Sequence, residues 1–187
     1  MINVGELRKN SKILLDGEPF VVQEVNFVKP GKGQAFYKCK LRNYLTGSLL
    51  DRTFRSGESF DTAEITERPM QFLYSQGDEY HFMDTETYDQ VMLTGDQVAD
   101  AKNYLVDNLN LDILFWEGRA IGITLPNFVD LEVVRADPWA KGDSVSGDTK
   151  PVTLETGLRL QVPPFVEEGE KITVDTRTGA YVTRVKK

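Results

Sequence analysis

The sequence is poor in the residues that build most catalytic and metal sites. Its 187 residues include one cysteine, Cys39, and one histidine, His81. A lone cysteine excludes an intrachain disulfide and favours a reducing compartment, so we expect the protein in the cytoplasm. Because Cys39 lies in an alternating segment and His81 in an aromatic one, we expect both to pack within strands.

Sequence motifs for catalysis are also missing. The chain has no HExxH, CxxC, GxSxG or Walker sequence, so nothing supports metal, nucleophile or nucleotide chemistry. Its carboxylates are numerous but scattered, and no two are paired in the sequence for acid–base work. We therefore expect a protein that is not an enzyme and that needs no metal or other cofactor.

Long apolar runs are absent as well. None approaches the roughly 20 residues that a membrane-spanning helix needs. The first residues, MINVGELRKNSK, lack the apolar segment of a signal peptide. We therefore expect no membrane association.

The charge of the chain is negative overall but unevenly distributed. The formal net charge is −7, of which residues 1–60 carry +4 and the remainder −11. Seven lysines and arginines fall within residues 25–55, where Asp51 is the one acidic residue. This asymmetry is typical of a protein whose N-terminal part meets a polyanion. A solvated basic face on a small β-domain explains it equally well.

Strand and turn signals dominate the chain. Apolar runs flank turn sequences typical of β-hairpins, namely Asp16-Gly17, Gln76-Gly77-Asp78, Glu117-Gly118, Thr156-Gly157 and Arg177-Thr178-Gly179. The sequence predicts an all-β fold of three small β-barrel domains in tandem, at residues 1–64, 65–127 and 128–187, with OB-type barrels for the later two. One short helix is expected at residues 95–105, with Asp96 as its N-cap.

One segment of the first domain, FVKPGKGQAF, presents a lysine on a bare turn. Pro30 fixes its own φ and favours an extended residue before it. Gly31 and Gly33 allow positive φ and remove side-chain bulk beside Lys32. The segment thus predicts a long cation at the end of a thin hairpin, although an ordinary turn with a solubilising lysine remains an alternative. It is not a P-loop, because the GxxxxGK[ST] spacing is missing.

This tip and the segment KLRNYLTG that begins at Lys40 closely resemble bacterial translation elongation factor P. The similarity continues in residues that keep the spacing of the family's C-terminal signature: Lys150, Val152, Gly157, Leu160, Val162, Pro163, Val166 and Gly169. Segments that begin at Pro126, Lys141 and Val174 are also similar, so the resemblance covers essentially the whole chain. The loop at residues 142–150, GDSVSGDTK, departs from the family, which more often has GDT followed by alanine.

The resemblance implies an L-shaped protein with the outline of a tRNA, built from a KOW-like N-terminal domain and two OB-like domains. Such a factor binds the ribosome, through its rRNA and ribosomal proteins, between the peptidyl and exit tRNA sites. It promotes peptide-bond formation at consecutive prolines by positioning the peptidyl-tRNA. In the family the tip lysine, here Lys32, often carries an amine-bearing group, which implies a lysine-modifying enzyme as a partner. We expect the factor to act as a monomer.

Basic residues near the tip are candidates for contacting RNA. They are Lys29, Lys38, Lys40, Arg42, Arg52 and Arg55. In the third domain, the resemblance places the loop at residues 142–150 and the closing strand near the small subunit and the tRNA body, which adds Tyr181 and Arg184. These two side chains point to opposite sides of an ideal strand, so they share a partner only if the strand bends. A core Tyr181 and a solvated Arg184 are the alternative.

Three other functions remain open from the sequence. A paralogue of elongation factor P with other client proteins would usually lack the Pro-Gly-Lys-Gly tip that is intact here. A generic OB-type RNA-binding protein would combine exposed aromatic and basic residues in the later domains, whereas those domains are acidic. An enzyme would show saturable turnover by the isolated protein.

Overall fold

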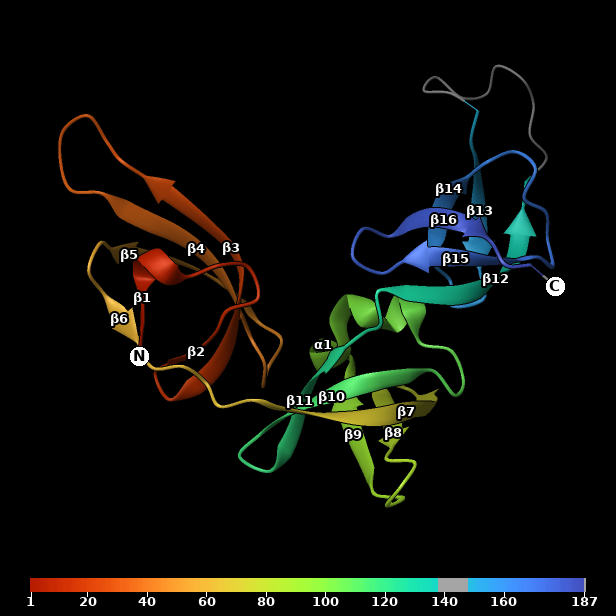
Figure 1. Cartoon of the computed structure of the whole chain (residues 1–187), viewed down its shortest axis with the longest axis horizontal. Helices are drawn as coiled ribbons and strands as arrows, with labels where there is room; N and C mark the ends of the chain where they lie inside the picture. Colours follow the sequence, from red (N-terminus) through yellow and green to blue (C-terminus); the bar gives the residue numbers. More distant parts are fainter. Residues whose placement is uncertain (138–147, 187) are drawn as a thin grey trace.

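The computed structural model of the chain describes residues 1–137 and 148–186. Three β-rich units follow one another along a bent path, with the central unit at the corner (Figure 1). This architecture confirms the predicted all-β fold of tandem barrels. The part of the loop at residues 142–150 that precedes Asp148 lies outside the described residues.

The first unit contains a 3-10 helix, η1 (Val4–Glu6), and six strands: β1 (Ile2–Asn3), β2 (Lys12–Leu15), β3 (Glu18–Val28), β4 (Phe36–Asn43), β5 (Leu49–Arg55) and β6 (Ser59–Phe60). Strands β2-β3-β4-β5 form one antiparallel sheet, and β1 pairs with β6. Asp16 and Gly17 form the two-residue loop between the paired Leu15 and Glu18, and both have positive φ, 53° and 80°. This is the hairpin geometry that Asp-Gly favours, so the predicted hairpin is confirmed.

The second unit is a five-stranded antiparallel sheet of β7 (Thr66–Gln76), β8 (Glu79–Met83), β9 (Gln90–Thr94), β10 (Asn110–Trp116) and β11 (Arg119–Thr124). Its order is β11-β10-β7-β8-β9. Two-residue turns at Gly77-Asp78 and Glu117-Gly118 join β7 to β8 and β10 to β11, as predicted. The edge strands β9 and β11 also approach each other, which curves the sheet toward a barrel.

The expected helix at residues 95–105 is wrong in two respects. The α-helix α1 (Gly95–Val98) is one turn long, and a 3-10 helix, η2 (Ala99–Tyr104), follows it. Thr94, not Asp96, is the N-cap, because the Thr94 hydroxyl and the Gln97 side chain exchange hydrogen bonds with each other's backbone in a capping box. Ala99 has a φ of 52°, and this left-handed residue ends the α-helical geometry.

The third unit contains β12 (Phe128–Ala136), β13 (Lys150–Leu154), β14 (Arg159–Val162), β15 (Lys171–Asp175) and β16 (Ala180–Arg184). They form an antiparallel sheet in the order β14-β13-β12-β15-β16. The predicted hairpins around Thr156-Gly157 and around residues 177–179 are confirmed, since β13 pairs with β14 and β15 with β16.

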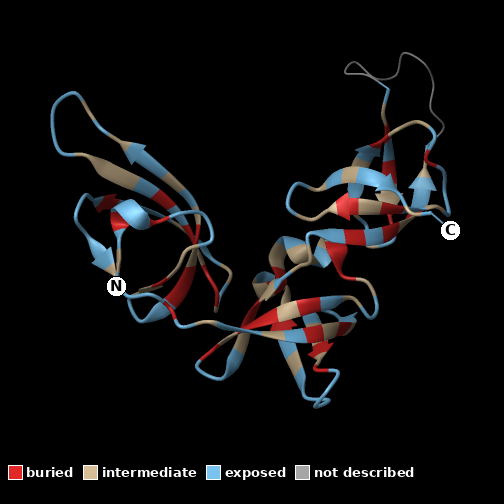
Figure 2. Ribbon diagram, viewed as in Figure 1, coloured by how far each residue is buried: buried red, intermediate tan, exposed pale blue. Residues whose placement is uncertain are grey.

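Each unit has its own apolar core, and buried residues, red in Figure 2, recur along the strands of all three units. Cys39 is buried in the first core. The His81 ring is half-buried and stacks on Tyr74 with centroids 4.6 Å apart. Both residues therefore pack in strands as predicted. Within the described residues, no helix is both long and apolar enough to span a bilayer.

Candidate functional site

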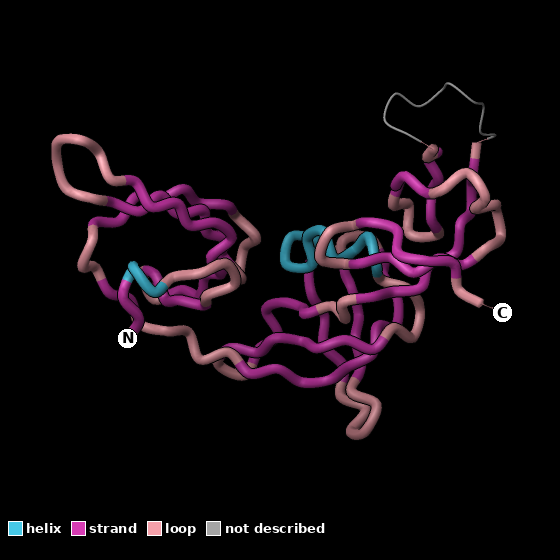
Figure 3. The backbone as a smooth tube through the Cα atoms, turned by 45° about the horizontal axis from the view of Figure 1, so that its top comes forward, coloured by secondary structure: helices cyan, strands magenta, loops and turns pink. Residues whose placement is uncertain are grey.

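The lysine segment forms the end of a long hairpin that projects from the first unit (Figures 1 and 3). Strands β3 and β4 remain paired up to Val28 and Phe36, and residues 29–35 close the loop. Lys32 lies in the middle of this loop with its side chain exposed. Gly33 has a φ of 110°, whereas Gly31 is not in the left-handed region, so only one of the two glycines uses its conformational freedom.

An aromatic pair supports the hairpin where it leaves the barrel. The rings of Phe27 and Tyr37, which lie opposite each other on β3 and β4, have centroids 5.0 Å apart and an interplanar angle of 48°. Phe27 is 56% exposed, while Tyr37 packs against the edge of the first core. The pair lies at the base of the loop that carries Lys32, and the sequence analysis did not single out either residue.

The basic candidates on β4 have different surroundings. Lys38 lies between Asn26 and Thr53 of the neighbouring strands. Lys40, two residues further from the tip, lies between two carboxylates, Glu24 and Asp51. Residues directly opposite in an antiparallel sheet share a face, so Lys40 has two carboxylates as direct cross-strand neighbours and Lys38 has none.

Other candidates in the first unit separate as well. Arg55 lies opposite Phe36 and so shares the face of Lys38 near the tip, and Lys29 belongs to the tip loop. Arg52 lies opposite the buried Cys39, and its guanidinium is 3.9 Å from a carboxylate oxygen of Asp16. The structure therefore places Lys38 and Arg55 on one face at the base of the hairpin and Lys29 in the tip loop with Lys32, whereas Arg52 lies on the opposite face.

Arg42 lies at the contact between the first and second units. Its guanidinium donates hydrogen bonds to the main-chain carbonyls of Asp96 and Gln97 in α1. Burial lowers the pKa of Arg42, and the nearby Tyr44 and acidic residues act in the opposite direction. The Arg42 side chain is thus bonded to the second unit of its own chain, away from the tip loop.

The two candidates in the third unit share one face of β16. Tyr181 pairs with Val174 and Arg184 with Ile172, and a bulge in β16 adds the extra residue that makes both registers possible. Tyr181 packs against the third core. The Arg184 guanidinium lies 4.6 Å from the centroid of the exposed Phe165 ring. The bulge supplies the bend in the strand that Tyr181 and Arg184 need in order to contact one partner. Tyr181, however, is partly buried against the core.

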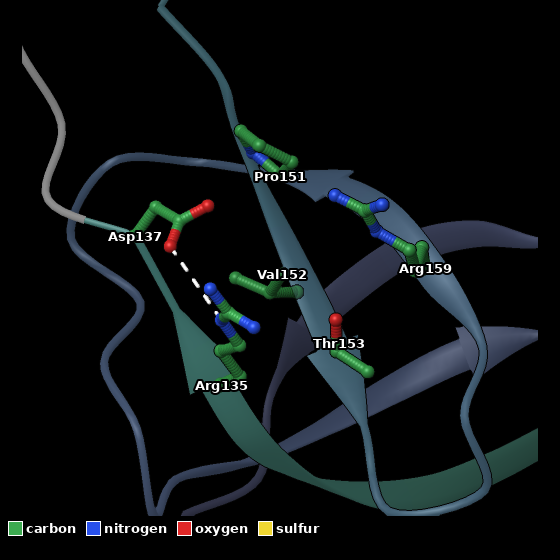
Figure 4. A pocket seen from close by; sticks show the side chains of 6 residues that line it. All are labelled: Arg135, Asp137, Pro151, Val152, Thr153 and Arg159. Carbon is green, nitrogen blue, oxygen red and sulfur yellow. Dashed lines mark ion pairs between the residues drawn. The ribbon is translucent and has the colours of Figure 1, made fainter.

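A shallow pocket of about 360 Å³ on the third unit contains two arginines that the sequence analysis did not single out (Figure 4). Arg135 on β12 and Arg159 on β14 both lie opposite Thr153 of the intervening strand. Arg135 Nε is 3.7 Å from a carboxylate oxygen of Asp137. The two arginines are far apart in the sequence, and the pairing of β12, β13 and β14 brings them to one pocket.

The arrangement defines a class of protein in which a small barrel with a projecting basic hairpin precedes an OB-type barrel. The same fold occurs in a solved structure of eukaryotic translation initiation factor 5A from Methanococcus jannaschii. That structure matches with a TM-score of 0.50 and 22% sequence identity over 66% of this chain and 91% of the other. At 22% sequence identity, the similarity between the two structures shows a shared fold only.

Sequence comparisons identify the family within that class. Residues 3–60 match the elongation factor P KOW-like domain, residues 65–123 its OB domain and residues 129–184 its C-terminal domain. Over the full length of both chains, this protein is 72% identical to elongation factor P of Desulfatibacillum aliphaticivorans and 60% identical to that of Syntrophus aciditrophicus. The chain therefore belongs to the elongation factor P family of translation factors.

Proposed function

We propose that this protein binds the ribosome between the peptidyl and exit tRNA sites and places Lys32 against the CCA end of the peptidyl-tRNA. The observation that carries the proposal is the exposed lysine at the end of a projecting hairpin in a chain of this family. Proline reacts slowly in peptide-bond formation because its ring restricts the approach of the reacting groups. Holding the peptidyl-tRNA in a reactive geometry lowers the entropic part of the barrier.

Lys32 acts in this proposal as a positioning group. Its ammonium offers three hydrogen-bond donors and no acceptor, which suits the phosphate and sugar oxygens of the CCA end. The ribosome remains the catalyst, so the factor needs no cofactor. Stalls at consecutive prolines are the reactions that gain most from such positioning.

The exposed loop also suits a lysine-modifying enzyme. Gly31 and Gly33 leave no side chain directly beside Lys32, and no other heavy atom lies within 4 Å of where a Cβ of Gly31 would stand. An enzyme can therefore surround the lysine without displacing the barrel. An added amine-bearing group would extend the reach of the cation toward the CCA end.

Basic residues other than Lys32 are proposed to hold the factor on RNA. Lys29, Lys38 and Arg55 lie near the tip, and Arg135 and Arg159 form a second basic site in the third unit. The acidic remainder of the chain limits indiscriminate RNA binding. This separation of charge favours a ribosomal factor over a generic OB-type RNA-binding protein.

A reconstituted translation assay tests the proposal. Wild-type protein is expected to accelerate synthesis of a peptide with consecutive prolines, and Lys32→Ala to lose that effect. Lys9→Ala, an exposed lysine elsewhere in the first unit, is the matched control and should behave as wild type. Because Lys32 is exposed, its removal should change the free energy of unfolding by less than about 0.5 kcal/mol. Full activity of Lys32→Ala would refute the proposal, and a much lower melting temperature would show a structural lysine.

A further inference from the structure

The first and second units meet through a buried apolar joint. Tyr44, which directly follows β4, is 5% exposed and packs in one cluster with Leu114, Trp116 and Ile121 of the second unit. Apolar residues from both sides cover this cluster: Leu14, Val21, Leu45 and Ile65. A buried cluster that crosses between two units resists changes in their relative orientation.

Two glycines allow close approach at this joint, Gly122 to a side-chain ring and Gly47 to a backbone. A Cβ at Gly122 would lie 3.2 Å from two ring carbons of Tyr44. A Cβ at Gly47 would lie 2.6 Å from the main-chain oxygen of Asp96, a distance that real Cβ atoms essentially never show. Any side chain at Gly47 would therefore push α1 away from the first unit.

Arg42 bridges the same joint. Its guanidinium donates to the Asp96 and Gln97 carbonyls, the second at 3.2 Å. The Asp96 carbonyl thus contacts both Arg42 and the site of Gly47, which links the hydrogen bonds to the close approach of the backbones. Charge-assisted hydrogen bonds of this kind are directional and add an orientational restraint to apolar packing.

We propose that Arg42, Tyr44, Gly47 and Gly122 are positioning residues that fix the angle between the first two units and so determine where Lys32 arrives. The inference rests on the proposed function of Lys32. From Arg42 to Phe36 the strand alone extends about 20 Å, at about 3.3 Å per residue. With the tip loop added, a rotation of about 10° at the joint displaces Lys32 by about 4 Å, which exceeds the misplacement that positioning catalysis tolerates.

Gly47→Ala is the variant that tests this inference, with Gly17→Ala as its matched control. Both glycines have similar positive φ, 77° and 80°, so the backbone strain is comparable, but no atom lies within 4 Å of a Cβ at Gly17. Spin labels on Gln34→Cys and Gln76→Cys report the distance between the tip and the second unit, while Cys39 stays buried. We expect Gly47→Ala to shift or broaden this distance distribution and Gly17→Ala to leave it unchanged.

The functional readout is diproline synthesis at saturating factor. Gly47→Ala should lower the saturating rate at least fivefold relative to Gly17→Ala, because excess factor cannot correct a misplaced tip. An unchanged distance distribution, or a changed one with an unchanged saturating rate, would overturn the inference. If wild-type protein itself does not accelerate diproline synthesis, the proposed function fails, and the distance measurement still reports the joint.

Arg42→Ala provides a second variant that adds no bulk, in case Gly47→Ala does not fold. Its matched control is Arg8→Ala, because Arg8 also donates to two main-chain carbonyls, those of Gly5 and Leu7, but within the first unit. Arg42→Ala should broaden the distance distribution and lower the saturating rate severalfold, whereas Arg8→Ala should change neither. Equal behaviour of the two variants would count against the joint as the positioning element.

Discussion

The Phe27 ring packs 5.0 Å from the Tyr37 ring at the point where the lysine hairpin extends beyond its barrel. Past this pair, only Val28 and Phe36 remain in register before the loop begins. The aromatic contact therefore lies one residue pair short of the loop that carries Lys32. A support of this kind affects where the lysine points more than it affects the stability of the fold.

Phe27→Ala should lower the rate of diproline synthesis severalfold while the melting temperature changes little. Phe27 is more than half exposed, so its truncation removes little buried area, but it frees the stalk beneath the tip. Val134→Ala, which truncates an exposed apolar residue of the third unit, is the control and should be neutral in both measurements. A rate equal to wild type for Phe27→Ala would show that the stalk is rigid without the pair.

Charge reversal of Lys38 should weaken ribosome binding more than reversal of Lys40. Glu24 and Asp51 lie directly opposite Lys40 and should offset part of its charge, whereas the residues directly opposite Lys38 are neutral. Binding measured against salt concentration should give a shallower slope for Lys38→Glu than for Lys40→Glu, because fewer counterions are released.

The exposed Glu167 provides the control for this comparison. Glu167→Lys should leave the affinity and the salt slope close to those of wild type. Equal losses from Lys38→Glu, Lys40→Glu and Glu167→Lys would show that net charge, and not a defined basic face, determines ribosome affinity.

Local signals predicted much of the fold. Asp16-Gly17 and Glu117-Gly118 form turns as expected, because their backbone preferences act over two residues. The helix cap was missed because Thr94 and Gln97 satisfy each other in a capping box, and the single α-helical turn ends at Ala99. Local propensity alone does not determine such short helices.

The candidate site was less predictable than the fold. Lys32 was visible because its loop sequence is local, and the structure places it as expected. The surroundings of Arg42, Lys40 and the Arg135–Arg159 pair depend on strand register and on contacts between units, which the sequence does not state directly. A charge count along the chain grouped residues that the sheet places on different faces.

The carboxylates of Asp84 and Asp89 should make stability depend on acidic pH. Backbone N–H groups of Glu86 and Thr87 lower the pKa of Asp84, and hydrogen bonds from Arg68 and Thr87 lower that of Asp89. Because both folded-state pKa values lie below the unfolded ones, this stabilisation is present above about pH 4 and is lost as the pH falls further. The melting temperature should therefore decrease below about pH 4.

Asp84→Asn tests the cause of that decrease. The amide oxygen can still accept the two backbone hydrogen bonds, so the loop should keep its shape, while the titrating charge is removed. The variant should melt lower than wild type near pH 7 and show a smaller decrease below pH 4. A pH dependence identical to wild type would assign the acid sensitivity to other carboxylates.

Tyr44 should ionise late when the pH is raised. Burial at the joint raises the pKa of Tyr44 to about 12, and the nearby Arg42 only partly opposes this effect. A folded-state pKa above the unfolded value of about 10 means that burial of the neutral phenol stabilises the protein below pH 10. That contribution is lost as the pH rises toward 12, so the joint should weaken over this interval.

Ultraviolet absorbance of the phenolate follows this titration directly. Wild-type protein should show a late phase near pH 12, and Tyr44→Phe should lack it while it keeps the ring that packs against Gly122. Because the packing is retained, Tyr44→Phe should also preserve diproline synthesis and the distance between the tip and the second unit. If wild-type protein lacks this late phase, the Tyr44 hydroxyl is accessible to solvent, and the first two units separate in solution more often than a rigid joint allows.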